Sequence, residues 1–233
     1  MNIQNILVIG AGHGIGLGLV QSLNSHFPGA TIFATYRNKT KASGLLELAL
    51  QTTQLDPQDE ARVESYFETL PKLDLIYCAV GALESPEKSL RDLSVDGLVQ
   101  SFKINAAIPG LILKYAKKKF DRTSASRLIF LSAMVGSISD NELGGWYGYR
   151  AAKSALNMLV KTASIEYARA GLQTKLAVIH PGTTDTELSR AYLGSVKHKV
   201  WSAKQSAEHI IEVSLNLDES GVFKNWDGTT IAW

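Results

Sequence analysis

Short apolar runs alternate with amphipathic segments along the whole chain. The runs predict β-strands over residues 3–9, 30–36, 51–55, 73–81, 127–132 and 175–179. Apolar residues at helical spacing predict helices around residues 19–23, 40–49, 95–119, 144–163 and 204–217, with a further helix that begins at Asp56. The tail, residues 221–233, predicts a hairpin that turns at Asp227-Gly228.

This alternation continues over all 233 residues without an internal repeat, a low-complexity tract or a linker. Strands that alternate with helices form a parallel sheet covered on both faces. We therefore predict an α/β fold, a single doubly wound Rossmann domain over residues 1–233 with a mostly parallel seven-stranded sheet flanked by helices. The polar, irregular segment 187–203 is expected to be a mobile substrate lid.

Composition narrows the classes of partner. Hydrophobic residues make up 45% of the chain and charged residues 20%, as in an ordinary soluble globule. A net charge of +2 gives no broad electropositive field, so we expect no nucleic-acid partner. No apolar run approaches the ~20 residues that span a bilayer, and the N-terminus does not resemble a signal peptide. The single cysteine, Cys78, fits a reducing compartment. A cytoplasmic protein is expected, with no membrane contact and no metal site.

A glycine-rich turn follows the first predicted strand and leads directly into a helix. Its positions are Gly10, Gly12, His13, Gly14, Ile15 and Gly16. Glycines let the backbone approach a pyrophosphate, and the start of a helix offers free N–H groups and a positive dipole end. Glycine also serves ordinary tight turns, but the order strand, glycine turn and helix predicts a dinucleotide site.

The end of the second predicted strand indicates which dinucleotide. An acidic residue about 20 positions after the glycines would bind the ribose 2′-hydroxyl of NAD. Tyr36 and Arg37 stand there instead, and no acid occurs between Thr31 and Leu46. Arg37 can pair with a 2′-phosphate, and His13 can lie near the same group. The sequence thus favours NADP(H) over NAD(H).

Asp56 has two possible roles. Followed by Pro57, it suits the cap of a helix, because Asp caps and Pro fits the first turn. It could also contact the adenine of the nucleotide. Capping alone explains the residue, and we prefer it.

Tyr149 and Lys153 lie four residues apart, so on a helix they share one face. Free tyrosine titrates near pH ~10. An ammonium about 4 Å away would stabilise the phenolate by ~1–4 kcal/mol and lower the pKa of Tyr149 accordingly. Tyr149 could then donate a proton to a developing alkoxide or take one from an alcohol. Tyr and Lys at this spacing are also common on solvated helix faces, so the other motifs decide whether this pair is catalytic.

Four motifs in order make the chain resemble the short-chain dehydrogenase/reductase family along nearly its whole length. They are Gly10-x-x-x-Gly14-x-Gly16, Asn105, Tyr149-x-x-x-Lys153 and Pro181-Gly182-x-x-x-Thr186. Residues 136–150 and the ending Asp227-Gly-x-x-Ile-x-Trp233 resemble the C-factor-like branch, which also includes Sniffer-type carbonyl reductases.

The resemblance implies a role for each matching residue. Tyr149 would be the general acid, Lys153 would bind the nicotinamide ribose and lower the pKa of Tyr149, and Asn105 would hold a water that relays protons. Gly182 and Thr186 would flank the nicotinamide carboxamide. Further cofactor contacts are expected from Asp56, Val80, Gly81, Pro181 and Thr184. Family members also form homodimers or homotetramers, here expected through the helices that carry Asn105 and Tyr149.

The chain departs from the family pattern where the fifth strand ends. The family places Ser-Ser there, and the second serine polarises the substrate carbonyl; this chain has Ser132-Ala133. Two nearby residues are candidates to supply the hydroxyl: Ser132, and Ser137 twelve residues before Tyr149. If neither hydroxyl reaches the substrate, the loss of one oxyanion donor costs about 3–4 kcal/mol of transition-state stabilisation. Cys78 alters the turn after the fourth strand and is expected to be a buried small residue.

Three functions remain open from the sequence. The first is an NADP(H)-dependent oxidoreductase that reduces a small-molecule carbonyl, or oxidises an alcohol, by hydride transfer. The second is a cofactor-binding regulatory or signalling protein with weak or no catalysis, which Ala133 and the C-factor resemblance motivate. The third, an isomerase or dehydratase on the same scaffold, is neither supported nor excluded.

Overall fold

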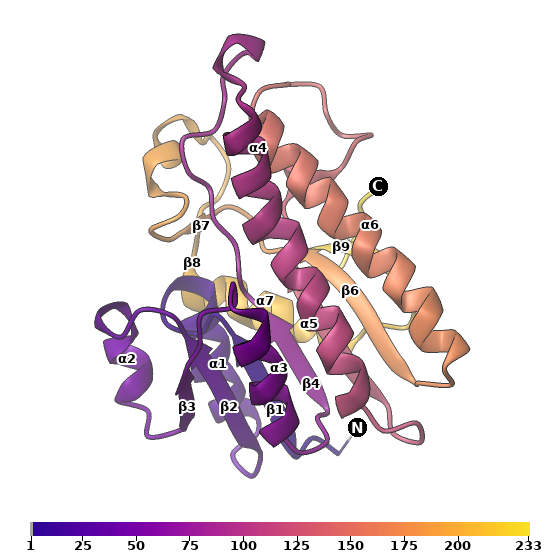
Figure 1. Ribbon diagram of the computed structural model, residues 1–233. Helices are drawn as coiled ribbons and strands as arrows, with labels where there is room; N and C mark the ends of the chain where they lie inside the picture. The colour runs from indigo at the N-terminus through magenta and orange to yellow at the C-terminus, as the bar shows by residue number, and fades with distance from the viewer. Residues whose placement is uncertain (1) are drawn as a thin grey trace.

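Seven parallel strands form the central sheet of the computed structural model, which describes residues 2–233 (Figure 1). The strand order is β3-β2-β1-β4-β5-β6-β9. The strands are β1 (Asn5–Ile9), β2 (Thr31–Tyr36), β3 (Gln51–Gln54), β4 (Leu75–Cys78), β5 (Ser126–Leu131), β6 (Thr174–His180) and β9 (Val222–Asn225). The short strands β7 (Thr184–Asp185) and β8 (Trp201–Ser202) pair separately. The predicted doubly wound Rossmann architecture is confirmed, and every pairing in the main sheet is parallel.

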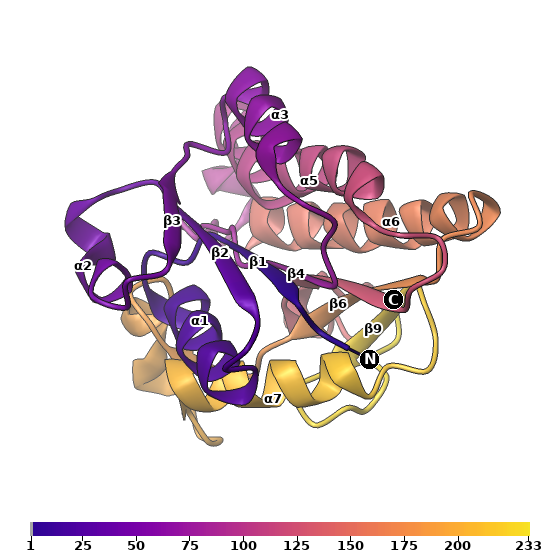
Figure 2. The same cartoon turned by 90° about the horizontal axis from the view of Figure 1, so that it is seen from below.

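Helices cover both faces of the sheet (Figure 2). They are α1 (Gly14–His26), α2 (Ser43–Leu46), α3 (Glu60–Thr69), α4 (Val95–Phe102), α5 (Ile108–Ala116), α6 (Tyr147–Arg169) and α7 (Ala203–Leu215). Helices α1 and α7 pack on one face, and α3, α5 and α6 pack on the other.

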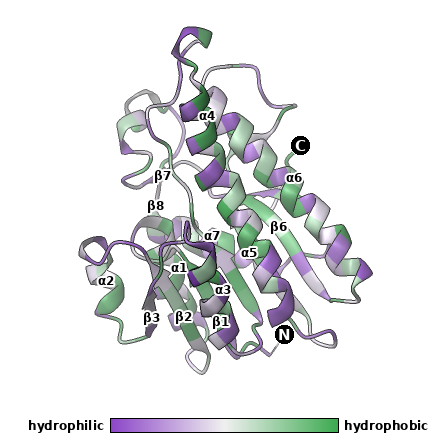
Figure 3. Ribbon diagram, in the orientation of Figure 1, coloured by the Kyte–Doolittle hydropathy of each residue, from purple (hydrophilic) through white to green (hydrophobic). Residues whose placement is uncertain are grey.

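The alternation of strand side chains creates these two cores. In β1, Ile6 and Val8 point to the α1/α7 layer, whereas Leu7 and Ile9 point to the α3/α5/α6 layer. A strand buried on both faces therefore reads as an unbroken apolar run. Figure 3 shows the hydrophobic colour along the central strands and the hydrophilic colour on loops and outer helix turns.

Two predicted elements differ in detail. Helix α3 begins at Glu60, not at Asp56, because Asp59 is its cap and accepts from the backbone N–H of Arg62 at 3.1 Å. The helix expected over 95–119 runs through a π-helical turn, Lys103–Ala107, immediately before Pro109. Proline lacks the N–H of a regular helical bond, and the wider turn lets the chain pass it without ending the helix.

Two further predictions concern the expected lid and the tail. The expected lid, 187–203, contains a 3₁₀ helix, Arg190–Ser195, and the strand β8. The predicted turn at Asp227-Gly228 is confirmed by an antiparallel bridge between Lys224 and Thr230. Within residues 2–233, no helix is both long and apolar enough to cross a membrane.

Candidate nucleotide-binding and catalytic site

The glycine turn between β1 and α1 needs glycine for steric reasons. Gly10 and Gly14 have positive φ angles of 82° and 56°. At Gly16, a Cβ atom would lie 2.1 Å from the carbonyl oxygen of Gly10, so no larger residue fits. The hydroxyl of Thr35 accepts from the N–H of Gly10 at 3.3 Å and ties the turn to β2. Helix α1 starts here with no acid in its first turn, so its positive end is not neutralised locally.

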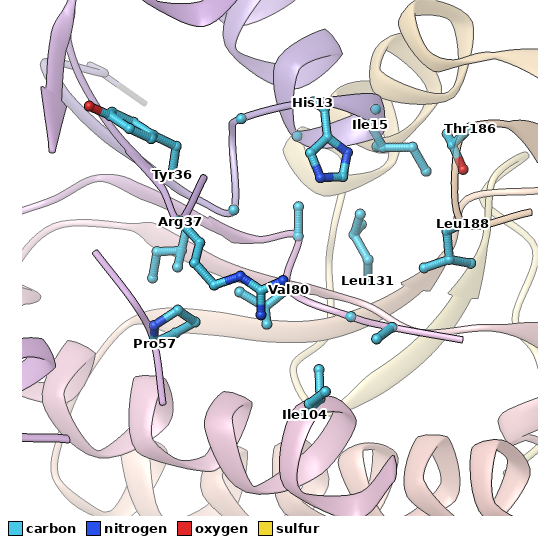
Figure 4. Close-up of a pocket in the computed structure, with 18 of the residues that line it drawn as sticks. His13, Ile15, Tyr36, Arg37, Pro57, Val80, Ile104, Leu131, Thr186 and Leu188 are labelled. Atoms are coloured by element: carbon cyan, nitrogen blue, oxygen red, sulfur yellow. The ribbon is translucent and has the colours of Figure 1, made fainter. Parts of the chain in front are cut away.

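This turn forms one wall of a cleft of about 350 Å³ at the carboxyl edge of the sheet (Figure 4). The edge collects loops that follow several parallel strands, the usual place for ligands in open α/β sheets. Fourteen residues predicted for the site line the cleft. They are Gly10, Gly12, His13, Gly14, Ile15, Gly16, Arg37, Val80, Gly81, Ser132, Tyr149, Lys153, Pro181 and Thr186.

Basic side chains gather at the glycine-turn end of the cleft. Arg37 extends into the cleft toward Val80, whereas the ring of the neighbouring Tyr36 points away (Figure 4). His13 lies in the glycine turn, and Lys41 lines the same space. Lys41 also forms an ion pair with Glu187, which links the segment after β2 to the expected lid. This end is therefore suited to a phosphate-bearing ligand.

Tyr149 and Lys153 stand at the other end of the cleft, one turn apart on α6. Lys153 is 3% exposed, and its ammonium donates to the carbonyl oxygen of Leu131 at 2.9 Å. The ammonium lies 5.6 Å from the centre of the Tyr149 ring. Leu131 ends β5, so the sheet itself fixes the position of Lys153.

The pKa of Tyr149 differs from the sequence prediction. We expected Lys153 to lower it, but burial raises the pKa of Tyr149 above its usual value. Burial also lowers the pKa of Lys153, to about 8, against a smaller opposing effect of Cys78. The Lys153 ammonium donates to the Leu131 carbonyl, and burial alone accounts for the raised pKa of Tyr149.

Asn105 lies outside the main cleft and makes a two-way contact with the backbone. Its amide oxygen accepts from the N–H of Ala82 at 3.1 Å, and its amide nitrogen donates to the Ala82 and Ser101 carbonyls at 3.0 and 3.1 Å. A Cβ atom on Gly81 would be 3.3 Å from the Asn105 oxygen and 3.5 Å from the Lys153 nitrogen. Asn105 thus holds the segment after β4 close to Lys153.

The structure separates the two candidate serines. Ser132 is 4% exposed, lines the cleft and donates to the amide oxygen of Asn157 at 2.7 Å. Ser137 donates to the Ala232 carbonyl at 2.6 Å and lines a different hollow, so it ties the loop to the tail. Of the two serines, only Ser132 lines the same cleft as Tyr149, and its hydroxyl already donates a hydrogen bond to Asn157.

Three other predicted residues fall outside the cleft walls. The hydroxyl of Thr184 bonds to Ser206 at 2.6 Å, within the fold. Gly182 has a φ of 74° and packs against Trp201 and Trp226, leaving no room for a side chain. Asp56 accepts from the N–H of Gln58 at 3.1 Å, a local turn contact, while its neighbours Leu55 and Pro57 line the cleft.

Several lining residues were not predicted. They are Ile9, Thr35, Tyr36, Asn38, Lys41, Leu55, Pro57, Ala79, Ala82, Glu84, Ile104, Leu131 and Leu188. Most lie at or just after the carboxyl end of a strand, so the predicted strand ends could have identified them. Ile104, Glu84 and Leu188 carry no such signal. Cys78, as expected, is buried, and burial raises the pKa of its thiol to about 11.

No group of three or more His, Cys, Asp or Glu side chains close enough to hold a metal ion occurs among residues 2–233.

Comparison with known proteins agrees with this geometry. The model of the short chain dehydrogenase family matches residues 4–194. The chain belongs to the short-chain dehydrogenase/reductase family of oxidoreductases.

Individual relatives bear out the resemblance to the C-factor and Sniffer branch. The chain is 27% identical over 160 residues to the C-signal protein of Myxococcus xanthus, covering 68% of this chain and 86% of that protein. It is 26% identical to an NADPH-bound carbonyl reductase from chicken fatty liver, with a TM-score of 0.88 over 100% of this chain and 95% of that one. The carbonyl reductase Sniffer of D. melanogaster, 24% identical, has the same fold with a TM-score of 0.88 over 100% of both chains.

Proposed function

We propose that this protein is an NADP(H)-dependent oxidoreductase that interconverts a carbonyl and an alcohol on a small molecule, with Tyr149 as the general acid and base. The observation that carries the proposal is a single cleft, with the glycine turn and Arg37 at one end and Tyr149 and Lys153 at the other. The residues suit an NADP(H) molecule, because the glycine turn at the start of α1 and the basic side chain of Arg37 line the same cleft as Tyr149. A bound NADPH would supply the hydride.

The cofactor preference follows from the charges at the glycine-turn end. Arg37, His13 and Lys41 all line that end of the cleft. An arginine matches the geometry of a phosphate through paired N–H groups, and the 2′-phosphate is what distinguishes NADP from NAD. The chicken carbonyl reductase, which is similar to this chain, is described as NADPH-bound.

On the chain's side, the chemistry is a proton transfer from Tyr149. The phenol hydroxyl would give its proton to the carbonyl oxygen as negative charge develops there. With a pKa of about 8, Lys153 is mostly protonated at neutral pH, so its charge can stabilise the phenolate left behind. Asn105 and the Leu131 carbonyl would position Lys153 and the chain after β4.

The oxyanion would receive fewer donors than is usual in the family. Position 133 is alanine, and the hydroxyl of Ser132 donates its hydrogen bond to the amide oxygen of Asn157. The absence of one donor costs about 3–4 kcal/mol of transition-state stabilisation. We therefore expect a slow enzyme.

The same observation favours a second candidate, a cofactor-binding regulatory protein with little catalysis. The relative named C-signal is consistent with such a role. The two candidates differ in one measurable property, since both bind NADPH but only the first oxidises it with a carbonyl compound.

We also propose that two copies associate through α4 and α6. Val95, Val99 and Phe102 form an apolar stripe on α4 and are 75%, 59% and 48% exposed. Met158 and Ile165 are similarly exposed on the adjacent helix α6. Pairing of two such faces would remove the apolar surface of these side chains from water. Equilibrium sedimentation tests the idea, and a particle of 25.3 kDa, the mass of one chain, would contradict it.

The decisive experiment for the enzyme is Tyr149→Phe, with Tyr147→Phe two residues earlier as the matched control. Removing the Tyr149 hydroxyl should lower kcat about 10²–10⁴-fold with a panel of aldehydes, ketones and quinones. NADPH binding, followed by the change in its fluorescence, should persist in both variants. Equal turnover by wild type and Tyr149→Phe would refute the mechanism, and NADPH binding without any turnover would favour the regulatory candidate.

A further inference from the structure

A second cavity, of about 320 Å³, adjoins the catalytic end of the main cleft. Tyr149 belongs to the walls of both cavities, as do Ala82, Glu84 and Ile104. The second cavity extends from Tyr149 toward α4 and is bounded there by Asn105 and Ser101. A molecule that places its carbonyl against the Tyr149 hydroxyl therefore has room for a substituent on this side.

The charges of the two cavities are opposite in sign. The main cleft has four basic residues, His13, Arg37, Lys41 and Lys153, against the single carboxylate of Glu84. The second cavity has three carboxylates, on Glu84, Glu87 and Asp92. Among its lining residues, all of which the structure describes, there is no Lys, Arg or His.

Two of these carboxylates are held in place by the backbone. An oxygen of Glu87 accepts from the N–H of Gly148 at 3.1 Å, at the start of α6. Asp92 accepts from the N–H groups of Lys88 and Ser89 at 3.0 and 2.9 Å, and these bonds keep its pKa below the usual range. Within residues 2–233, none of the ion pairs involves the three carboxylates. The carboxylates of Glu87 and Asp92 are thus held in place beside the cavity.

We propose that this second cavity receives the substituent of the substrate next to the reacting carbonyl, and that it selects neutral or positively charged polar substituents against anionic ones. The inference rests on the proposed function, because it takes Tyr149 as the reacting group. The other polar residues that line the second cavity, such as Ser101 and Gln100, suit a substituent with hydrogen-bonding groups. Carboxylate or phosphate substrates would be repelled, although the neighbouring cleft attracts an anionic cofactor.

The expected size of the effect follows from Coulomb's law. A carboxylate about 7 Å from an anion in a water-exposed site weakens its binding by roughly threefold, and three such groups by about tenfold or more. Salt should reduce the effect, since the cavity is open to solvent.

The test compares three benzyl alcohols that differ only in the para substituent: carboxylate, carboxamide and trimethylammonium. Their dissociation constants are measured by calorimetry with the NADPH-loaded protein, where no hydride transfer can occur. The carboxylate should bind at least about tenfold more weakly than the carboxamide, and the trimethylammonium compound at least as tightly. The corresponding aldehydes are then assayed for turnover.

Variants identify the source of the preference. Glu84→Gln and Glu87→Gln should each shrink the carboxylate-to-carboxamide ratio by about threefold, and the double variant should shrink it by about tenfold. Gln at position 87 can still accept from Gly148, so α6 keeps its contact. Glu64→Gln on the exposed side of α3 removes the same charge outside both cavities and should leave the ratio unchanged.

The outcomes separate this inference from the proposed function. Equal binding of the three alcohols, no binding of any of them, or a ratio insensitive to Glu84→Gln and Glu87→Gln overturns the inference. Turnover of the aldehydes without a charge preference leaves the proposed function standing. A charge preference in binding without any turnover supports the cavity and refutes the enzyme.

Discussion

The two ends of the cleft are built in different ways. At the glycine-turn end, one continuous segment from β1 into α1 shapes the wall through its backbone, and Gly16 touches the Gly10 carbonyl so closely that no side chain fits. At the Tyr149 end, side chains come from β5, α6, the π-helical turn and the chain after β4. A local backbone requirement can be read from neighbouring residues, whereas a wall assembled from distant segments cannot.

Gly16→Ala tests whether the backbone of the glycine turn shapes its end of the cleft, and it should have the largest effect. Its Cβ atom would lie 2.1 Å from the Gly10 oxygen, so the turn must shift. We expect the NADPH dissociation constant to rise by at least about 100-fold, or about 2.7 kcal/mol, and the free energy of unfolding to fall by about 1–3 kcal/mol or more. Titration of NADPH fluorescence and urea unfolding measure the two effects.

Gly29→Ala is the matched control for that variant, because nothing lies within 4 Å of a Cβ atom at Gly29. It should leave both quantities nearly unchanged. If the two variants behave alike, the glycine turn does not shape the nucleotide wall.

Arg37→Gln tests the charge at the same end and should have a smaller effect. Loss of a charge-assisted bond to the 2′-phosphate should weaken NADPH binding by about 10- to 100-fold, or about 1.5–3 kcal/mol. NADH lacks that phosphate, so its binding should change little. Arg62→Gln, an exposed arginine on α3, is the control, and a parallel loss of NADPH and NADH binding would rule out the assignment.

Ala133→Ser tests whether a missing oxyanion donor at the Tyr149 end limits the rate, and it has the smallest expected effect. A hydroxyl at position 133 would restore the serine that the family uses, and kcat should rise by about tenfold. The gain stays below the full worth of an oxyanion donor, because Ala133 is not among the residues that line the cleft. Ala125→Ser, exposed before β5, controls for a serine elsewhere. An unchanged kcat would show that oxyanion stabilisation does not limit the rate.

Much of the fold could be predicted because its signals are local. The predicted strands located six of the seven strands of the main sheet, the predicted tail hairpin contains the seventh, β9, and the order of glycine turn and helix identified the nucleotide end. The start of α3 was misplaced because Asp56 and Asp59 are both plausible caps, and only the hydrogen bond to Arg62 distinguishes them.

The Tyr149 end could be predicted only in part. The spacing of Tyr149 and Lys153 brought them to one helix face, but the pKa of Tyr149 moved in the opposite direction to the prediction. The reason is burial of the Tyr149 phenol, which depends on segments that are distant in the sequence. In the same way, nothing adjacent to Ser132 in sequence reveals that Asn157 accepts a hydrogen bond from its hydroxyl.

The packing of Gly182 between two indole rings gives the protein an internal optical probe. Trp201 and Trp226 are 4.8 Å apart and lie directly behind Gly182, whose neighbour Pro181 lines the cleft. Indole emission overlaps the absorption of a reduced nicotinamide ring, so light absorbed by this pair can pass to a dihydronicotinamide nearby. Occupancy of the cleft can therefore be read from the tryptophan fluorescence of the unlabelled chain.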